Sequence, residues 1–242
     1  MKILKSFGDF TKGLADGLPI CLGYLSVSFA FGIFAVGNGL SILEAFFMSA
    51  TNVTSAGQLS AVPIIACGGS LLELSFTQFI INLRYSLMSV SLSQKFDGSI
   101  RLRDRFVIAF VNTDEVFAVA SSKKDKVGKS YMYGLIILPF VGWSVGTLIG
   151  AAAGAVFPPI VTNALGIAIY GMFAAICIPA AREDTMAALC MLTAVVLSCA
   201  FKYIPMLSVV SQGFVIIICS VAASALFAYI DCKKEERRSV CK

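Results

Sequence analysis

The stretch Phe106-Val-Ile-Ala-Phe-Val-Asn112-Thr-Asp114-Glu115-Val-Phe-Ala-Val-Ala120 holds four polar residues inside apolar sequence. A second polar island, Asn82-Leu-Arg84, closes the mainly apolar run that begins at Leu71. An arginine or aspartate at the centre of a bilayer costs roughly 2.5–3.5 kcal/mol on the insertion scale. Charged residues at that depth are usually paired, face the interior of a bundle and mark a path for a substrate or an ion.

The composition around these islands is that of a membrane protein. Of the 242 residues, 58% are hydrophobic and 14% are charged, whereas soluble domains carry about 25% charged residues. Several apolar runs approach the roughly 20 residues that span a bilayer. We therefore predict an all-α, polytopic membrane helix bundle with about seven or eight hydrophobic helices, some of them broken or re-entrant. Residues 1–242 are expected to form a single integral membrane transporter domain in the lipid bilayer, with a basic cytoplasmic tail over about 231–242. No nucleic-acid partner is expected.

Hydropathy divides the chain into candidate helices separated by turn residues. The lead-in over residues 1–12 is basic and amphipathic and lacks the cleavage site of a signal peptide, so we expect the first helix to be retained. A polar break over residues 52–58 interrupts one apolar region, and the segment 106–120 is shorter than a full span. The predicted helices cover residues 13–36, 42–51, 59–66, 70–92, 106–120, 131–153, 160–178, 186–201 and 207–230.

Positive charge gathers at the N-terminus, at residues 95–105, at residues 123–129 and at residues 233–238. The positive-inside rule places all four clusters, and so both termini, in the cytoplasm of a multi-pass protein of the cell membrane. Both ends of segment 106–120 would then lie on the same side. We therefore favour a re-entrant or broken helix there, a form tolerated where backbone lines a cavity.

Two further patterns concern helix packing. Gly17-Leu-Pro19-Ile-Cys-Leu-Gly23-Tyr24 is echoed by Leu138-Pro139-Phe-Val-Gly142-Trp143 about 120 residues later, as an internal transporter repeat would require. This echo is short, and coincidence is the alternative. Glycines at 146, 150 and 154 are spaced as a face for close helix packing, against another helix of this chain or of a partner.

The sequence contains little that suggests an enzyme. It has no histidine, and its eight cysteines form no C-x-x-C pair, so we expect neither a metal site nor another cofactor. Gly128-Lys129-Ser130 is not a phosphate-binding loop, because that loop needs a glycine where Lys123 stands. If the protein moves protons, carboxylates must carry them.

The polar islands have both functional and structural interpretations. Arg84 either belongs to a lined cavity, together with the polar face that Asn82 continues, or extends to the cytoplasmic interface. Asn52-Val-Thr54 either lines a site, caps a helix or is a glycosylation sequon. Asp114 and Glu115 point about 100° apart on a helix, so one can pair with Arg84 while the other binds a proton, a cation or a substrate amine; alternatively, both lie in water at a helix end.

The ordered set of motifs resembles the AzlC-type branched-chain amino-acid exporter family, the large subunit of a two-component exporter. The matching pieces are Gly17-x-Pro19 with Phe31-Gly32, Ser49 with Ala56-Gly57-Gln58, Asn82-Leu-Arg84 and Thr113-Asp114-Glu115-x-Phe117. The family usually has histidine after Asn-Leu-Arg, where this chain has Tyr85. This difference leaves open how transport is coupled in this chain and which substrate it takes. The resemblance implies export of leucine, isoleucine, valine or related amino acids, driven by the proton gradient and assisted by a small AzlD-type membrane subunit.

Together these arguments predict a secondary transporter for an amino-acid substrate. Proton coupling is expected at Asp114 and Glu115, and substrate binding at Asn52, Gly57, Gln58, Asn82 and Arg84. A channel or transporter for another small polar solute or ion, or the permease subunit of an ATP-driven system, would use the same polar islands. A membrane-embedded enzyme is disfavoured because no nucleophile–base pair is recognisable.

Overall fold

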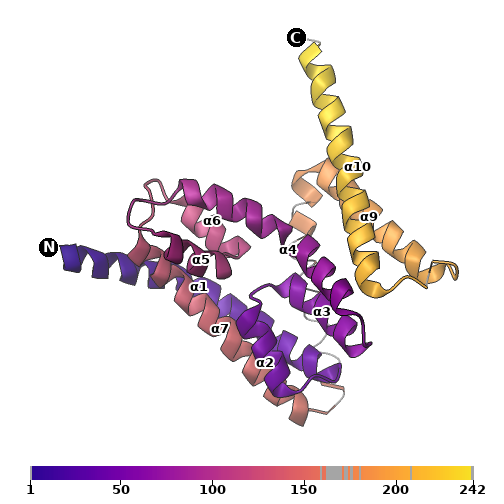
Figure 1. The fold of residues 1–242 in the computed structure, drawn as a ribbon, viewed down its shortest axis with the longest axis horizontal. Coiled ribbons are helices and arrows are strands. Elements are labelled where there is room, and N and C mark those ends of the chain that lie inside the picture. Colours follow the sequence, from indigo (N-terminus) through magenta and orange to yellow (C-terminus); the bar gives the residue numbers. More distant parts are fainter. Residues whose placement is uncertain are drawn as a thin grey trace. The chain divides into compact units, whose positions relative to one another are not determined.

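A computed structural model describes residues 2–158, 160–161, 171, 174, 177–179, 181–207 and 209–240. These residues form helices joined by short turns, with a single strand-like bridge between Phe96 and Val127 (Figure 1). Within the described residues, four helical segments are long and apolar enough to cross a membrane, namely 7–37, 129–156, 185–203 and 212–230. The predicted all-α membrane helix bundle is confirmed. The helix predicted over 160–178 lies largely outside the described residues.

The chain divides into two compact units. Unit 1 comprises Met1–Val62 and Ile81–Ile169, and unit 2 comprises Pro63–Ile80 and Tyr170–Lys242. Unit 1 holds α1 (Lys2–Gly37), α2 (Ile42–Thr51), most of α3 (Ser55–Ala66), the second half of α4 (Leu71–Gln94), α5 (Leu102–Phe110), α6 (Asp114–Ser122) and α7 (Lys129–Val156). Unit 2 holds the start of α4 with α9 (Thr185–Tyr203) and α10 (Gln212–Val240).

Helices α1 and α7 form the framework of unit 1 and lie side by side (Figure 1). They run parallel, because Gly13 lies against Leu135 near the start of both helices and Gly154 lies against Ile33 near their ends. A Cβ on Gly13 would stand 2.8 Å from the Leu135 amide nitrogen, and one on Gly154 would stand 3.1 Å from the Ile33 Cα. Such backbone-to-backbone approach is what small residues permit in membrane helix pairs. The glycines predicted as a packing face therefore pack against α1 of the same chain.

The parallel pairing also relates the two copies of the internal echo. Tyr24 and Trp143 end the matching stretches, and their rings meet edge to face with centroids 5.2 Å apart. Pro19 and Pro139 lie inside α1 and α7 respectively. Side-by-side placement of matching positions is what a repeat predicts, although the repeat itself stays a prediction.

Local signals explain where the elements begin and end. Ser41 and Glu44 form a capping box at the start of α2, with the Ser41 amide donating to Glu44 Oε2 at 2.7 Å. Gly39 has a positive φ of 93° and completes the turn predicted after the first helix. That first helix begins at Lys2 rather than at residue 13, so the amphipathic lead-in is part of the helix.

The α5–α6 segment is a hairpin whose two ends meet. The Asp97 amide donates to the Val127 carbonyl at 3.0 Å, and the Lys129 amide donates to Ser99 Oγ at 2.9 Å. Lys129 Nζ also lies 2.7 Å from Asp104 Oδ1. The predicted broken or re-entrant helix is therefore confirmed as two short helices that start and finish at the same end of unit 1.

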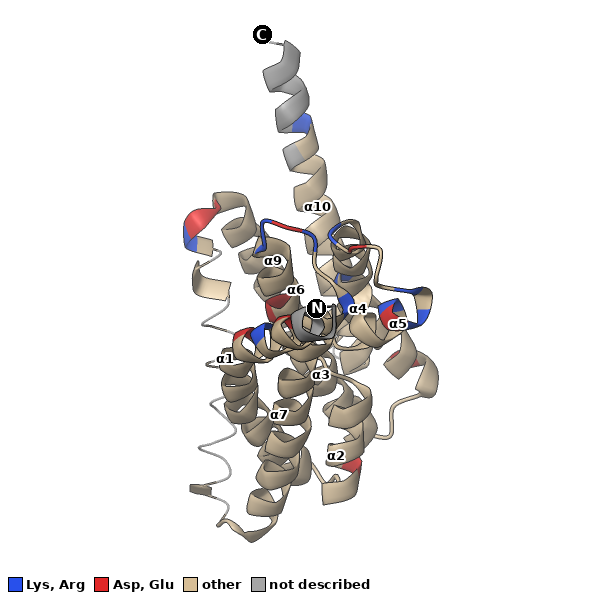
Figure 2. Cartoon of the chain, turned by 90° about the vertical axis from the view of Figure 1, so that its left-hand side faces the viewer, with Lys and Arg blue, Asp and Glu red and all other residues tan. Residues whose placement is uncertain are grey.

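Charged groups concentrate at this end of unit 1 (Figure 2). Lys123 Nζ on the loop after α6 lies 2.6 Å from Asp16 Oδ2 on α1. The Lys129 ammonium and the Arg101 amide hydrogen-bond the Asp104 carboxylate and hold its pKa at about 2. These ion pairs join α1 to the loop after α6, and α5 to α7, at the end of unit 1 that the charge pattern predicts to be cytoplasmic.

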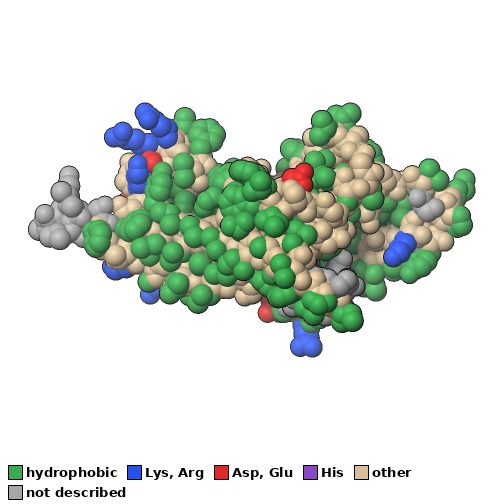
Figure 3. Space-filling view, turned by 90° about the horizontal axis from the view of Figure 1, so that it is seen from below, with side chains coloured by type: hydrophobic (Ala, Val, Ile, Leu, Met, Phe, Trp, Pro, Cys, Tyr) green, Lys and Arg blue, Asp and Glu red, His purple; other side chains and the backbone are tan. Residues whose placement is uncertain are grey.

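The remaining surface is largely apolar. Figure 3 shows hydrophobic side chains covering most of the face in view. On α7, the exposed residues Val141, Val145, Leu148 and Ile149 repeat at helical spacing opposite the glycine seam. In unit 2, α9 packs along α10 and has no buried residue. Faces of this kind suit a lipid environment.

Within unit 2, one acidic side chain is buried at a helix start. Glu73, which is 6% exposed, accepts a hydrogen bond of 2.9 Å from the Gly213 amide in the first turn of α10. A carboxylate there complements the positive end of the helix dipole. Glu73 therefore has a structural role as a helix cap in this unit.

Candidate functional site

Two helix breaks supply irregular backbone within unit 1. One separates α2 from α3 at residues 52–54, and the other separates α5 from α6 at residues 111–113. The four half-helices have 9 to 12 residues and so rise about 14–18 Å, roughly half of a 30 Å hydrocarbon core. In transporters, paired half-helices of this length have their breaks near the middle of the membrane, where the substrate sites are built.

A polar cavity of about 140 Å³ lies between the two breaks. It is bounded on one side by the α2–α3 break, on another by the second half of α4, and on a third by the last turn of α5. Its lining residues are Thr51, Asn52, Val53, Thr54, Asn82, Tyr85, Ala109, Phe110 and Asn112. The sequence-predicted residues Asn52 and Asn82 are therefore brought to one cavity.

A chain of polar contacts links the breaks through α4. Arg84 Nη2 lies 2.9 Å from Asp114 Oδ2, at the start of α6. The same nitrogen donates to Tyr85 Oη at 3.1 Å, and Tyr85 Oη donates to Thr54 Oγ1 at 3.4 Å in the other break. The Arg84 and Asp114 side chains are each 48% exposed, so a small solute can reach both charges.

The second carboxylate has a different partner. Glu115 Oε2 accepts a hydrogen bond from Tyr24 Oη on α1, and the Tyr24 ring packs against Trp143 of α7. Asp114 and Glu115 thus point toward different helices, as adjacent helical positions require. The site is in this way tied to the α1–α7 framework.

Gly57 and Gln58 lie within α3, whereas the sequence pattern assigned them to the polar break. The break ends at Thr54, because Thr54 caps the new helix by accepting from the Gly57 amide at 3.4 Å. Gln58 is fully buried and donates through Nε2 to Ser49 Oγ at 2.7 Å, and Ser49 Oγ lies 2.7 Å from Thr147 Oγ1. This network joins α2, α3 and α7 and does not line the polar cavity.

Several residues of the site were not predicted as functional from the residues themselves. Tyr24 appeared only in the internal echo, Tyr85 only as a departure from the family pattern and Ser49 only as part of the resemblance. Ser89 of α4, which accepts a 3.2 Å hydrogen bond from Asn112 Nδ2, gave no signal at all. The role of a neutral hydroxyl side chain in an apolar helix can be assigned only when its hydrogen-bond partner is known.

The electrostatics of the two breaks are opposite. The first turn of α3 carries no acidic residue, so the positive end of its dipole is not neutralised by its own sequence. The first turn of α6 carries Asp114 and Glu115. One break therefore favours an anionic group and the other a cationic group, which together suit a zwitterion.

Comparison with known proteins gives the family. The family model described as AzlC protein matches residues 19–157. The inner membrane protein YgaZ of Escherichia coli (strain K12) is 32% identical over 171 residues, which cover 68% of this chain and 70% of that protein. An uncharacterized membrane protein of Archaeoglobus fulgidus is 31% identical over 181 residues, covering 74% of this chain and 79% of its own length. No solved structure matches.

The matched region contains both helix breaks and the charged pair, and its relatives support a transporter-type role in the membrane. The chain belongs to the AzlC family.

Proposed function

We propose that this chain is a secondary transporter that exports leucine, isoleucine, valine or related amino acids, driven by the proton gradient. The observation that carries the proposal is the polar cavity between two helix breaks of opposite electrostatic character. The resemblance to branched-chain amino-acid exporters supplies the substrate class.

An amino-acid zwitterion needs a cationic partner for its carboxylate and an anionic partner for its ammonium. The Arg84 guanidinium and the start of α3 suit the carboxylate, since both favour negative charge. The Asp114 carboxylate suits the ammonium. Because Arg84 and Asp114 pair with each other at 2.9 Å, substrate would insert between them and replace one ion pair with two. Asn52 and Asn82 add neutral hydrogen-bonding groups to the cavity.

Proton coupling follows from the same pair. A proton on Asp114 removes its attraction for both Arg84 and a substrate ammonium, so protonation and substrate binding compete at this carboxylate. Glu115, held by Tyr24, is the second candidate carrier and connects the site to α1. Competition of this kind couples export of the amino acid to entry of a proton.

We further propose a small AzlD-type membrane subunit as partner and the inner or plasma membrane as the location. The exposed apolar surfaces of α9 and α10 are compatible with a membrane partner as well as with lipid. The charge clusters favour cytoplasmic termini.

The direct test is efflux of leucine, isoleucine and valine from preloaded cells that express this chain with and without its small membrane partner. Export that needs both chains, saturates and collapses with an uncoupler is expected. Non-saturable flux would instead indicate a channel, and flux that survives the uncoupler but fails on ATP depletion would indicate an ATP-driven system. Absence of amino-acid efflux in both conditions would remove the proposed substrate.

A further inference from the structure

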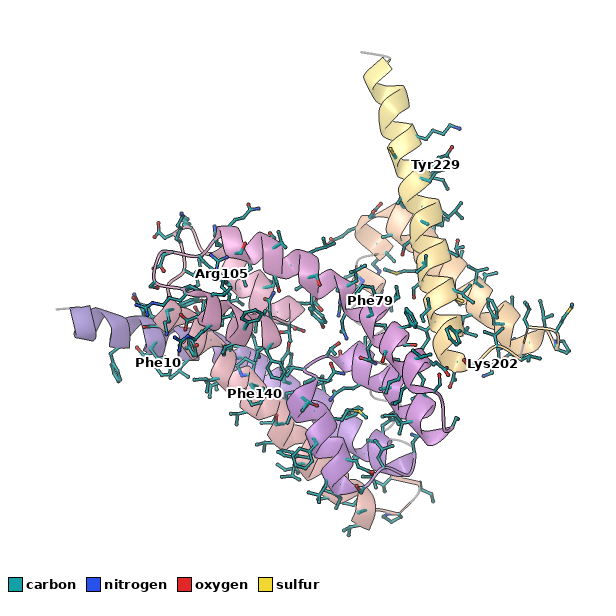
Figure 4. The ribbon with its side chains drawn as sticks, viewed as in Figure 1. Phe10, Phe79, Arg105, Phe140, Lys202 and Tyr229 are labelled. Carbon is teal, nitrogen blue, oxygen red and sulfur yellow. The ribbon has the colours of Figure 1, made fainter. Side chains whose placement is uncertain are left out.

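A second, apolar cavity adjoins the polar one in unit 1. It has a volume of about 300 Å³ and lies between the second half of α4 and α5. Arg105, labelled in Figure 4, also lines it, with the guanidinium carbon 5.7 Å from the centre of the Phe96 ring. Its apolar walls include Val90, Leu92, Phe96, Leu102, Phe106 and Ile108.

The two cavities share Ala109 and Asn112 in their walls. The polar cavity continues toward the break residues, and the apolar cavity continues along α5 away from them. The two cavities are therefore neighbours, one with a largely polar lining and the other with a largely aliphatic lining. A ligand with a charged head and a hydrocarbon side chain matches that division.

Asn112 marks the junction between the two cavities. Asn112 is only 3% exposed, and its Nδ2 atom donates a hydrogen bond to Ser89 Oγ at 3.2 Å. Its Oδ1 atom has no hydrogen-bond partner among the described residues. A buried carbonyl oxygen left without a donor is costly, so a ligand that brings an N–H group to this point is favoured.

We infer that the apolar cavity receives the aliphatic side chain of the substrate, with Asn112 Oδ1 accepting from its ammonium and Ala109 limiting the size of the side chain. This inference rests on the proposed amino-acid transport and names the residues that set its specificity. Each methylene buried in such a cavity is worth about fourfold in affinity. Leucine is therefore expected to bind up to roughly sixtyfold more tightly than alanine.

Two variants change the size of the cavity in opposite directions. Ala109→Leu fills the junction and should bring leucine affinity down to within a few-fold of alanine affinity. Phe106→Ala opens the cavity and should raise the affinity for phenylalanine; Phe106 is 71% exposed, so this variant removes little packing. Ala118→Leu is the matched control, because Ala118 is exposed on α6 and lines neither cavity.

The experiment measures equilibrium binding of glycine, alanine, valine, leucine and phenylalanine to the full-length protein in nanodiscs, with efflux of the same compounds measured in cells. Affinity that rises with side-chain size, is reordered by Ala109→Leu and Phe106→Ala, and is unchanged by Ala118→Leu supports the inference. Amino-acid efflux with a preference that neither cavity variant alters overturns the inference and leaves the proposed function standing. A size-ordered binding series without efflux overturns the proposed function and leaves the cavity assignment standing. If none of the five compounds binds, both the inference and the proposed function are overturned.

Discussion

Replacing Gly150 by alanine should weaken the pairing of α7 with α1. A Cβ on Gly150 would meet the carbonyl oxygen of Phe29 and lie 2.7 Å from its carbonyl carbon and 2.8 Å from its Cα. Ordinary van der Waals contact begins at 3.4 Å. The obstructing atoms are backbone atoms of a long helix, so the two helices must separate to admit the methyl group.

A matched control separates the free-energy cost of this clash from the gain in helix propensity. Overpacking of a close contact costs about 1–3 kcal/mol, while alanine gains about 1 kcal/mol over glycine in helix propensity. Gly23→Ala, on α1, makes the same propensity gain without the clash, because no atom of the described residues lies within 4 Å of a Cβ there. The Gly150→Ala protein should therefore be about 1–3 kcal/mol less stable than the Gly23→Ala protein.

Trp143 provides the readout. It is the single tryptophan of the chain, and it packs edge to face on Tyr24 across the α1–α7 pair. Its fluorescence should follow the separation of these helices during a titration with denaturing detergent. Equal unfolding free energies for Gly150→Ala and Gly23→Ala, within about 0.5 kcal/mol, would refute the close packing of α1 on α7 at this point.

Two other substitutions test single contacts. Tyr24→Phe removes the hydrogen bond to Glu115 but keeps the ring against Trp143. The free energy of unfolding, measured by the same titration, should therefore fall by about 1.5–3 kcal/mol. No loss would show that this bond does not hold α6 to α1. Asp104, whose folded pKa of about 2 lies below its ordinary value of 3.8, stabilises the protein above pH 4 and loses that contribution as pH falls toward 2. Asp104→Asn should flatten this part of the stability profile, and an unchanged profile would exclude the pair with Lys129 as its cause.

The sequence predicts the fold class and the broken helices because these follow from local patterns. The bounds of α2 were predicted without error, since Ser41 and Glu44 form a capping box and a polar residue follows Thr51. The break between α5 and α6 was predicted from polar residues in a segment too short to span.

The contacts that build the site were harder to predict. Glu115 and Tyr24 are 91 residues apart, and Ser49 and Thr147 are 98 apart, so no local periodicity relates them. Gln58 was assigned to the break because it is polar, whereas it is helical and buried among neutral hydroxyls. Hydrogen bonds between distant helices depend on how the helices pack, which local periodicity does not encode.

The most direct test of the account is leucine transport by Asp114→Asn, with Asp125→Asn in the loop after α6 as the charge-matched control. We predict that Asp114→Asn abolishes uphill leucine export driven by a pH gradient and weakens leucine binding, because the neutral amide neither carries the coupling proton nor pairs with the substrate ammonium. Asp125→Asn should export normally. Unchanged pH-driven export by Asp114→Asn would contradict the assignment of this carboxylate as a proton carrier, and with it the proposed coupling of export to the proton gradient.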